Sequence, residues 1–117
     1  MQSALAAARR LTSVPVVYHA GAESVALDGT EGASSQLLLD ASDVQTLVRF
    51  QNFLFTPEDL VIDSVPVIPE PGHWIGVEID GSTHKFEVVD LSGEPCFHYD
   101  SRRLTLFVKT KYVGIIA

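Results

Sequence analysis

The chain has 117 residues, of which 46% are hydrophobic and one is a cysteine, and its formal charge at pH 7 is −7. This length leaves no room for a second core, so we expect one domain, and a lone cysteine excludes an internal disulfide. The uncharged stretch from Leu11 to Ala22 is too short to span a bilayer, and the brief run Ala4–Ala8 is followed rather than preceded by arginines, unlike a secretory signal. We therefore expect a soluble, unprocessed chain.

The charge is unevenly distributed along the chain. All 15 acidic residues and only two bases, Arg49 and Lys85, lie between Leu11 and Ser101, which gives that stretch a charge of −13. Residues 1–10 carry +2 and residues 102–117 carry +4. An acidic body does not neutralise phosphates, which argues against sequence-specific binding to duplex nucleic acid. The basic C-terminal segment suits an acidic neighbour, including another copy of this chain.

The first 13 residues are predicted to form a helical arm in front of a β-barrel domain that spans residues 14–117. Ser3 is placed to cap this helix, and Pro15 prevents its continuation. Its apolar face is thin, so the helix must dock either on its own domain or on a neighbouring subunit. That face consists of Ala4, Ala7, Ala8 and Leu11.

Strand signals dominate after the arm, starting with a β-rich region at Val14–Tyr18. Seven strands are expected, at Glu23–Leu27, Gln36–Leu39, Val44–Phe55, Trp74–Ile79, His84–Val89, Cys96–Tyr99 and from Leu104 to Lys111. Turns are expected at Asp28-Gly29, Asp40–Asp43 and Ser92–Pro95 and at Asp100–Arg103. This spacing predicts a mainly β fold, a small antiparallel β-barrel or sandwich of about seven strands with a short N-terminal helix.

The longest of these segments, Val44–Phe55, changes character along its length. One face is polar at Arg49 and Gln51 but apolar at Phe53 and Phe55, which suits a strand that passes from one environment into another.

Three local signals after the longest strand predict a helical turn, an edge segment and a hairpin turn. In Thr56–Asp59, a capping residue followed by proline predicts a single helical turn. Three prolines between Ser64 and Gly72 remove backbone donors, so that stretch is an edge or loop along the rim of the sheet. Asp80-Gly81 predicts a type I′ hairpin turn after a strand whose inward residues are Ile75, Val77 and Ile79.

No catalytic or metal-binding constellation stands out. Cys96 and His98 fall on one face of a short strand, but a zinc site needs three or four ligands and there is no second Cys/His pair. Cys96 also lacks an oriented base, so it is not a candidate nucleophile. Glu78 and Glu87 are the nearest approach to a hydrolytic carboxylate pair, across the predicted hairpin. We expect no cofactor and no bound metal.

Two features suggest surfaces that meet other chains. The tail Tyr112–Ala117 is apolar to its end, including Ile115 and Ile116, so a partner or the domain's own sheet must cover it. The second feature is a group of cations whose charge complements the acidic body in a head-to-tail ring. These cations are Arg102, Arg103, Lys109 and Lys111.

Several short segments together resemble the small head-tail joining proteins of tailed bacteriophages, over roughly Val14 to Gly114. The segments are Asn52–Val61, the proline-rich turn with Gly72, Phe86–Val89, Gly93–Tyr99 and Leu104–Lys111. This chain departs from the family pattern at Phe97 and Tyr99, where tryptophans are usual, and near Ser101-Arg102, where the family has a Pro-Tyr pair.

The resemblance implies a non-enzymatic virion protein of the phage neck, a stopper or head-completion subunit. Such a subunit forms a homo-oligomeric ring, on the order of six or twelve copies for closed cyclic symmetry. The ring lies between the portal or adaptor ring and the tail terminator or tail tube, and is assembled in the host cytoplasm. DNA passes through it non-specifically, and no membrane is involved.

An acidic lumen lets DNA slide because it does not grip phosphates. We therefore expect some of the loop acids to face the channel. The candidates are Glu58, Asp59, Asp63, Asp80 and Glu94.

Two other classes of function are compatible with the sequence. A small-ligand-binding β-barrel would use interior aromatic residues to line a pocket, namely Phe50, Phe53, Phe86 and Trp74. A hydrolase would use paired carboxylates. The aromatic residues are no more numerous than one packed core needs, and no spacing singles out a carboxylate pair.

Overall fold

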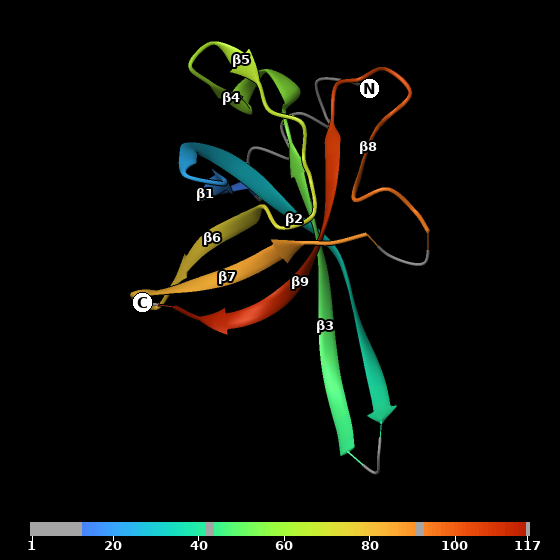
Figure 1. The fold of residues 1–117 in the computed structure, drawn as a ribbon. Coiled ribbons are helices and arrows are strands. Elements are labelled where there is room, and N and C mark those ends of the chain that lie inside the picture. Colours follow the sequence, from blue (N-terminus) through green and yellow to red (C-terminus); the bar gives the residue numbers. More distant parts are fainter. Residues whose placement is uncertain (1–12, 42–43, 91–92, 117) are drawn as a thin grey trace.

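Six strands close into a barrel in the computed structural model, which describes residues 13–41, 44–90 and 93–116. The strands run in the order β3-β2-β1-β6-β7-β9, and pairing between β3 and β9 completes the circle (Figure 1). Every pairing is antiparallel. The predicted mainly β fold is confirmed, and of the two predicted architectures the structure has the barrel.

The elements follow the chain in simple order. They are β1 (Ser13–Ala20), β2 (Glu23–Ala41), β3 (Val44–Phe55), the 3-10 turn η1 (Pro57–Asp59), β4 (Val61–Ile62), β5 (Val65–Pro66), β6 (Trp74–Ile79), β7 (Ser82–Val88), β8 (Phe97–Tyr99) and β9 (Leu106–Ile115). The short strands β4 and β5 form a separate two-stranded sheet at one end of the barrel. The described residues include no helix long and apolar enough to cross a membrane. The predicted N-terminal helix, with Ala4, Ala7, Ala8 and Leu11, lies outside the described residues.

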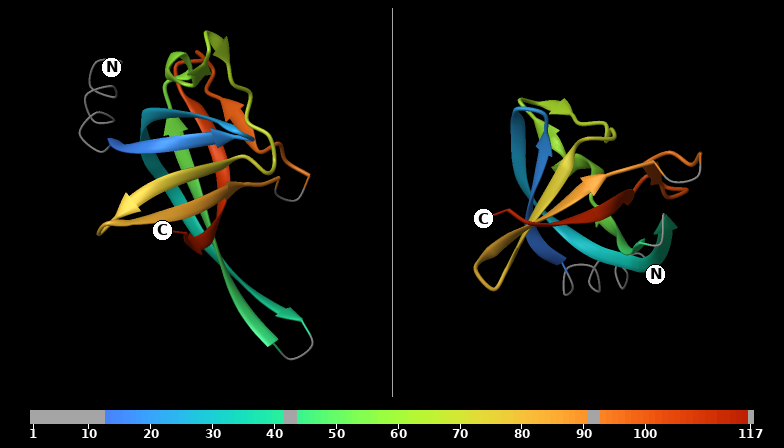
Figure 2. Two further views of the ribbon diagram at one scale, coloured as in Figure 1. Left: turned by 60° about the vertical axis from the view of Figure 1, so that its left-hand side comes forward. Right: turned by 60° about the horizontal axis from the view of Figure 1, so that its bottom comes forward.

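Strand β9 holds the sheet together because it pairs with three others. Strand β3 occupies one edge, so β8 and β7 share the other, β8 along Leu106–Val108 and β7 along Thr110–Ile115. The β2–β3 hairpin continues past the barrel as a two-stranded ribbon (Figures 1 and 2), which gives the molecule its extents of 49 × 31 × 29 Å.

Aromatic and branched side chains fill the barrel. Phe53 and Phe86 meet edge to face with ring centroids 5.1 Å apart, and Tyr18 meets Phe55 in the same way at 6.4 Å. These four side chains are fully buried, and they pack with aliphatic residues from β1, β6, β7 and β9. Such a core, tied to every strand of the barrel, is where most of the hydrophobic stabilisation lies.

The buried polar groups of this core are paired. The Thr110 hydroxyl donates to the Gln51 carbonyl at 2.8 Å, and the Gln51 side-chain amide donates to the carbonyls of Gly32 and Asn52 at 3.0 Å. The described residues contain no buried side-chain nitrogen or oxygen that lacks a partner. Gln51 therefore fits the buried face of β3 because its hydrogen-bonding groups are satisfied.

The turn expected at Asp28-Gly29 is wrong. Strand β2 runs through it for 19 residues, takes in the separate strand expected at Gln36–Leu39, and is interrupted only by a register shift between Glu31 and Ser34. Packing requires glycine at position 29, since a Cβ atom on Gly29 would lie 2.7 Å from Cε1 of the buried Phe55. Glycine marks close approach of a neighbouring side chain as readily as it marks a turn.

Two other predicted turns are confirmed. Asp80 and Gly81 both have positive φ, 51° and 82°, as a type I′ turn requires. In the η1 turn, Pro57 takes the first position, and Thr56 caps with its backbone carbonyl, 2.9 Å from the Asp59 nitrogen, rather than with its side chain. The proline-rich stretch lies at the edge as predicted, with Pro66 exposed in β5.

Three predictions near strand ends are wrong. Ile79 was expected inward but is 39% exposed, because β6 passes the rim of the barrel before its turn. Leu104 is exposed and precedes β9, which starts at Leu106. Cys96 precedes β8 and is buried, whereas His98 is exposed, so the two do not share a face.

Candidate interaction site

Loop acids and apolar side chains gather at the end of the barrel formed by η1, β4 and β5, which we call the upper end. Glu58 and Asp59 are exposed on η1, and Asp63 is exposed in the turn between β4 and β5 with φ 51°. Val65 and Ile68 beside them are 62% and 61% exposed. A hollow of about 380 Å³ lies between this segment and Tyr99 of β8. Apolar residues surrounded by charges are typical of a contact surface.

The basic turn between β8 and β9 lies at the same end (Figures 1 and 2). The Asp100 carboxylate accepts hydrogen bonds from the backbone nitrogens of Leu104 and Thr105, at 2.7 and 3.2 Å, and so shapes the turn. Arg102 is exposed, and the Arg103 guanidinium lies over the Tyr99 ring, 5.1 Å from its centroid. The upper end therefore carries acids on η1 and β4–β5 and cations on the β8–β9 turn.

Two of the predicted site residues bind each other. The Lys109 ammonium donates to the Glu94 carboxylate at 2.6 Å, and this hydrogen bond and charge lower the pKa of Glu94 below its usual range. Lys109, an expected interface cation, and Glu94, an expected channel acid, are thus paired within one subunit. Lys111, further along β9, stands opposite Glu87 of β7 and Phe50 of β3.

The apolar tail is covered only in part by its own sheet. Its backbone belongs to β9 and the residue after it, with the Ile116 nitrogen donating to the Thr83 carbonyl at 2.9 Å. The side chains of Ile115 and Ile116 remain 62% and 48% exposed. Asp80 is also exposed in the nearby β6–β7 turn, away from the acids of the upper end (Figure 1).

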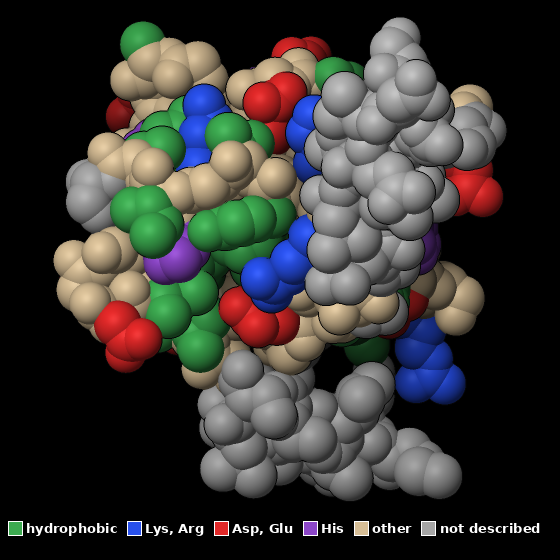
Figure 3. Space-filling model, turned by 90° about the horizontal axis from the view of Figure 1, so that it is seen from below, with side chains coloured by type: hydrophobic (Ala, Val, Ile, Leu, Met, Phe, Trp, Pro, Cys, Tyr) green, Lys and Arg blue, Asp and Glu red, His purple; other side chains and the backbone are tan. Residues whose placement is uncertain are grey.

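Sequence reasoning missed the role of Arg49, which lies at the end of the barrel next to the projecting ribbon. Its guanidinium lies over the rings of Phe86 and Tyr112, 5.7 and 5.5 Å from their centroids. The Tyr112 hydroxyl is in turn 2.7 Å from Nδ1 of His84. Figure 3 views the molecule from below, and there hydrophobic side chains lie beside a histidine and basic side chains. An arginine between Val48 and Phe50 gives no sequence signal for a ring contact 37 or 63 residues away.

The cysteine and the histidines make separate contacts in the described part of the chain. Cys96 is 4% exposed, its thiol donates to the Pro69 carbonyl at 3.4 Å, and burial raises its pKa. His98 stacks on Phe107, and Nδ1 of His73 forms a hydrogen bond of 2.8 Å with the hydroxyl of Tyr18, whose pKa is raised by burial. No group of three potential ligands occurs among the residues that the structure describes.

The structure changes the positions expected for residues of the other two classes of function. Glu78 stands opposite Thr83 in the β6–β7 register and Glu87 opposite Trp74, so the expected carboxylate pair across the hairpin is wrong. Trp74 was expected inside the barrel but stacks on His19 at its outer face, with ring centroids 3.6 Å apart. Phe53 and Phe86 are fully buried and pack against each other.

A family model described as phage head-tail joining protein matches residues 1–116 of the chain. The chain belongs to this family. Comparison with curated proteins gave no match, and comparison with solved structures gave none either.

Family membership indicates which kind of contact the exposed surfaces suit. A phage head-tail joining protein is a structural component of the virion, and its function lies in contacts with head and tail proteins. In this chain the exposed apolar and charged side chains at the ends of the barrel, rather than an enclosed pocket, are the features that suit such contacts.

Proposed function

We propose that this chain is a connector subunit of the phage neck, a stopper or head-completion protein that forms a closed ring around the DNA channel. The ring meets the portal or adaptor on one side and the tail terminator or tail tube on the other. The observation that carries the proposal is the family match, which spans residues 1–116. Support comes from a closed barrel that exposes apolar side chains at both ends and charges of both signs at its upper end, which suits contacts between copies.

The β8–β9 turn is the proposed contact with the acidic body of the next copy. Arg102 is exposed there, and Arg103 is held over Tyr99, so both cations are presented from a shaped turn. Lys111 and the exposed Ile115 and Ile116 extend the contact along β9. Lys109 contributes less, because Glu94 already neutralises it.

This contact is tested by complementing a phage that lacks the gene. With the double variant Arg102→Glu and Arg103→Glu, heads and tails should accumulate unjoined in electron micrographs, because like charges then face each other. The matched variant Arg102→Lys and Arg103→Lys keeps the charge and should restore joining. Normal joining by the glutamate variant would contradict this contact.

The acids of the upper end are the proposed lining of the channel. Glu58, Asp59 and Asp63 are exposed and close together in sequence and structure, whereas Asp80 lies on another turn and Glu94 is paired with Lys109. Replacing these three acids with lysine should slow DNA exit, because each new cation near the DNA adds a phosphate contact.

The control is a triple lysine variant at three exposed acids of β2, which changes the net charge equally. DNA exit is measured by dye binding to DNA released from triggered particles. Equal slowing by both variants, or by neither, would contradict the assignment of the channel to the upper end. The control acids are Glu23, Asp28 and Glu31.

A further inference from the structure

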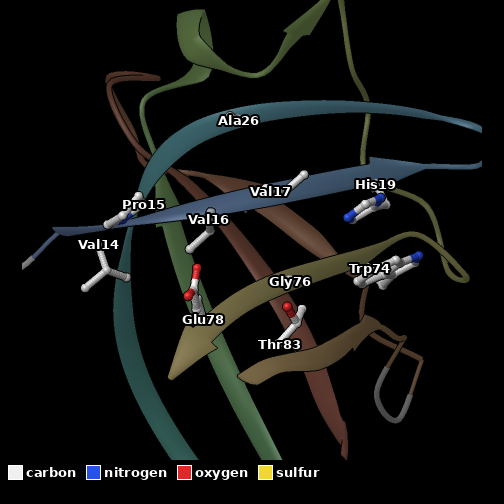
Figure 4. Close-up of a pocket in the computed structure, with 10 residues that line it drawn as sticks. All are labelled: Val14, Pro15, Val16, Val17, His19, Ala26, Trp74, Gly76, Glu78 and Thr83. Atoms are coloured by element: carbon white, nitrogen blue, oxygen red, sulfur yellow. The ribbon is translucent and has the colours of Figure 1, made fainter. Parts of the chain in front are cut away.

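The outer face of β1 and β6 is hollowed, although it is the side of the sheet that points away from the core. A groove of about 590 Å³ lies there (Figure 4). Its apolar wall includes Pro15 and Val17 of β1, Ala26 of β2 and Trp74 of β6. Water-facing strands normally alternate apolar inward and polar outward, so an apolar outer face points to a covering partner.

Gly76 forms the floor of the groove because it lacks a side chain. A Cβ atom there would lie 3.3 Å from Trp74 and 3.4 Å from Thr83, so the neighbouring side chains already close around the backbone. The stack of Trp74 on His19, with an angle of 5° between the rings, forms a flat wall at one end. The groove is therefore shallow and smooth, which suits small apolar side chains.

The two ends of the groove differ in charge. At the Trp74 end, the Lys85 ammonium lies 5.1 Å from the centre of the indole ring. At the other end, next to Val14 and Pro15, is the exposed carboxylate of Glu78. A segment that fits this groove should carry small apolar residues along its length and a cation at the Glu78 end.

We propose that the groove receives residues 1–12 of a neighbouring copy in the ring. This segment carries the row Ala4, Ala7, Ala8 and Leu11 and, at its end, Arg9 and Arg10. A helical row of that spacing covers about 10 Å, and the β1 side of the groove from Val14 to His19 is about 17 Å long, so the row fits. On a helix Arg10 lies at the side of this row and Arg9 lies opposite it, so Arg10 meets Glu78 while the alanines meet Val17, Gly76 and Trp74.

The donor is a neighbouring copy rather than the same chain because of how β1 begins. Ser13 already pairs with Thr30 of β2, and the register is unbroken to Ala20, so the chain enters the barrel along the strand direction. To reach its own groove, the preceding segment would have to reverse and run back along the outer face of β1. A segment donated to the next copy needs no reversal. The inference rests on the proposed ring, since it needs a second copy alongside.

A charge placed in the groove tests the contact. Ala26 lines the groove and is exposed, so Ala26→Arg should leave the barrel folded. Incorporation into particles should fall by about tenfold or more, because the variant introduces an unpaired charge into an apolar contact. Ala22→Arg is the matched control, at an exposed alanine in the β1–β2 turn outside the groove, and should incorporate normally. Equal incorporation of both variants would overturn the inference.

Crosslinking in assembled particles identifies the donor. A chain with Ala7→Cys and Ala26→Cys is treated with a short bifunctional thiol reagent, which the buried Cys96 does not reach. The inference predicts a ladder of covalent multimers on a denaturing gel, and no ladder from the matched pair Ala7→Cys with Ala22→Cys.

The other outcomes separate the two proposals. A crosslink within one chain only would assign the segment to its own groove and overturn the inference. Particles with a normal copy number but no crosslink would overturn the inference and leave the proposed ring intact. Absence of the unmodified chain from particles would contradict the ring, and the inference with it.

Discussion

Strands β2 and β3 pass through two different environments, and the contrast shows how one hairpin serves both as barrel wall and as projecting ribbon. Within the barrel, β2 pairs with β1 along Glu23–Thr30, and β3 pairs with β9 along Phe50–Phe55, so each strand has a barrel neighbour besides its hairpin partner. From the pair Gln36–Arg49 to the pair Ala41–Val44, the two strands pair only with each other. Stability is thus concentrated in the barrel part, which leaves the ribbon free to extend.

The largest effect is expected where β3 crosses the core. Phe53→Ala should lower the free energy of unfolding by about 3–5 kcal/mol, because the buried ring leaves a cavity next to Phe86. The matched variant Phe50→Ala, three residues earlier on the same strand, should cost less than half as much, since Phe50 is only half-buried. Denaturant unfolding measures both, and equal costs would contradict the proposed boundary between barrel and ribbon.

The second-largest effect on stability is expected on replacing the two glycines of β2. Gly29→Ala should cost about 1–3 kcal/mol, because its Cβ would press on the buried ring of Phe55. At Gly32 the nearest atom is Cδ1 of the half-buried Leu54, which is able to turn away, so Gly32→Ala should cost less than about 1 kcal/mol. If thermal melting ranks the two variants in the opposite order, the packing explanation for Gly29 fails.

Shortening the ribbon should change stability little. Replacing Leu38–Leu47 with Asn-Gly joins Leu37 to Val48, which already pair, through a two-residue turn. The free energy of unfolding should change by less than about 1 kcal/mol, because the removed residues pair only with each other. Replacing Leu38–Val48 instead shifts the register by one residue and should destabilise the barrel. If the first variant unfolds the protein, the ribbon is part of the folding unit.

The smallest effect concerns His19 at the outer groove. Burial, and to a lesser degree Lys85, lowers the pKa of His19 below its usual 6.5. The unfolded chain therefore binds the proton first as the pH falls, so stability is complete above pH 6.5 and declines from there through the lower pKa of the folded state.

The single tryptophan, Trp74, stacks on His19 and reports this titration through its fluorescence. The midpoint should lie below 6.5, and Lys85→Gln should raise it only part of the way back, since burial is the larger cause. His19→Gln should abolish the transition. A midpoint above 6.5 would contradict the described environment of His19.

Sequence alone predicted the features that depend on local chemistry. The Asp80-Gly81 turn, the η1 turn at Pro57 and the edge position of Pro66 follow from backbone restrictions on a few adjacent residues. The predicted change of environment along Val44–Phe55 is present, but it falls between Arg49, which is exposed, and Gln51, which is buried with Phe53 and Phe55.

Features that depend on contacts between distant strands were not predictable. Gly29 is indistinguishable in sequence from a turn glycine until Phe55 of β3 is placed beside it. The pairing of Lys109 with Glu94 needs β9 to pass the loop before β8, and the outer position of Trp74 depends on the register of β6 against β1. Periodicity identifies the two faces of a strand, but only the closed sheet decides which face is inside.

The central claim, a ring of this chain in the phage neck, is tested most directly by counting its copies in purified particles with quantitative mass spectrometry. The account predicts a constant number per particle, on the order of six or twelve, as closed cyclic symmetry gives. Complete absence of the chain from intact, tailed particles would contradict it.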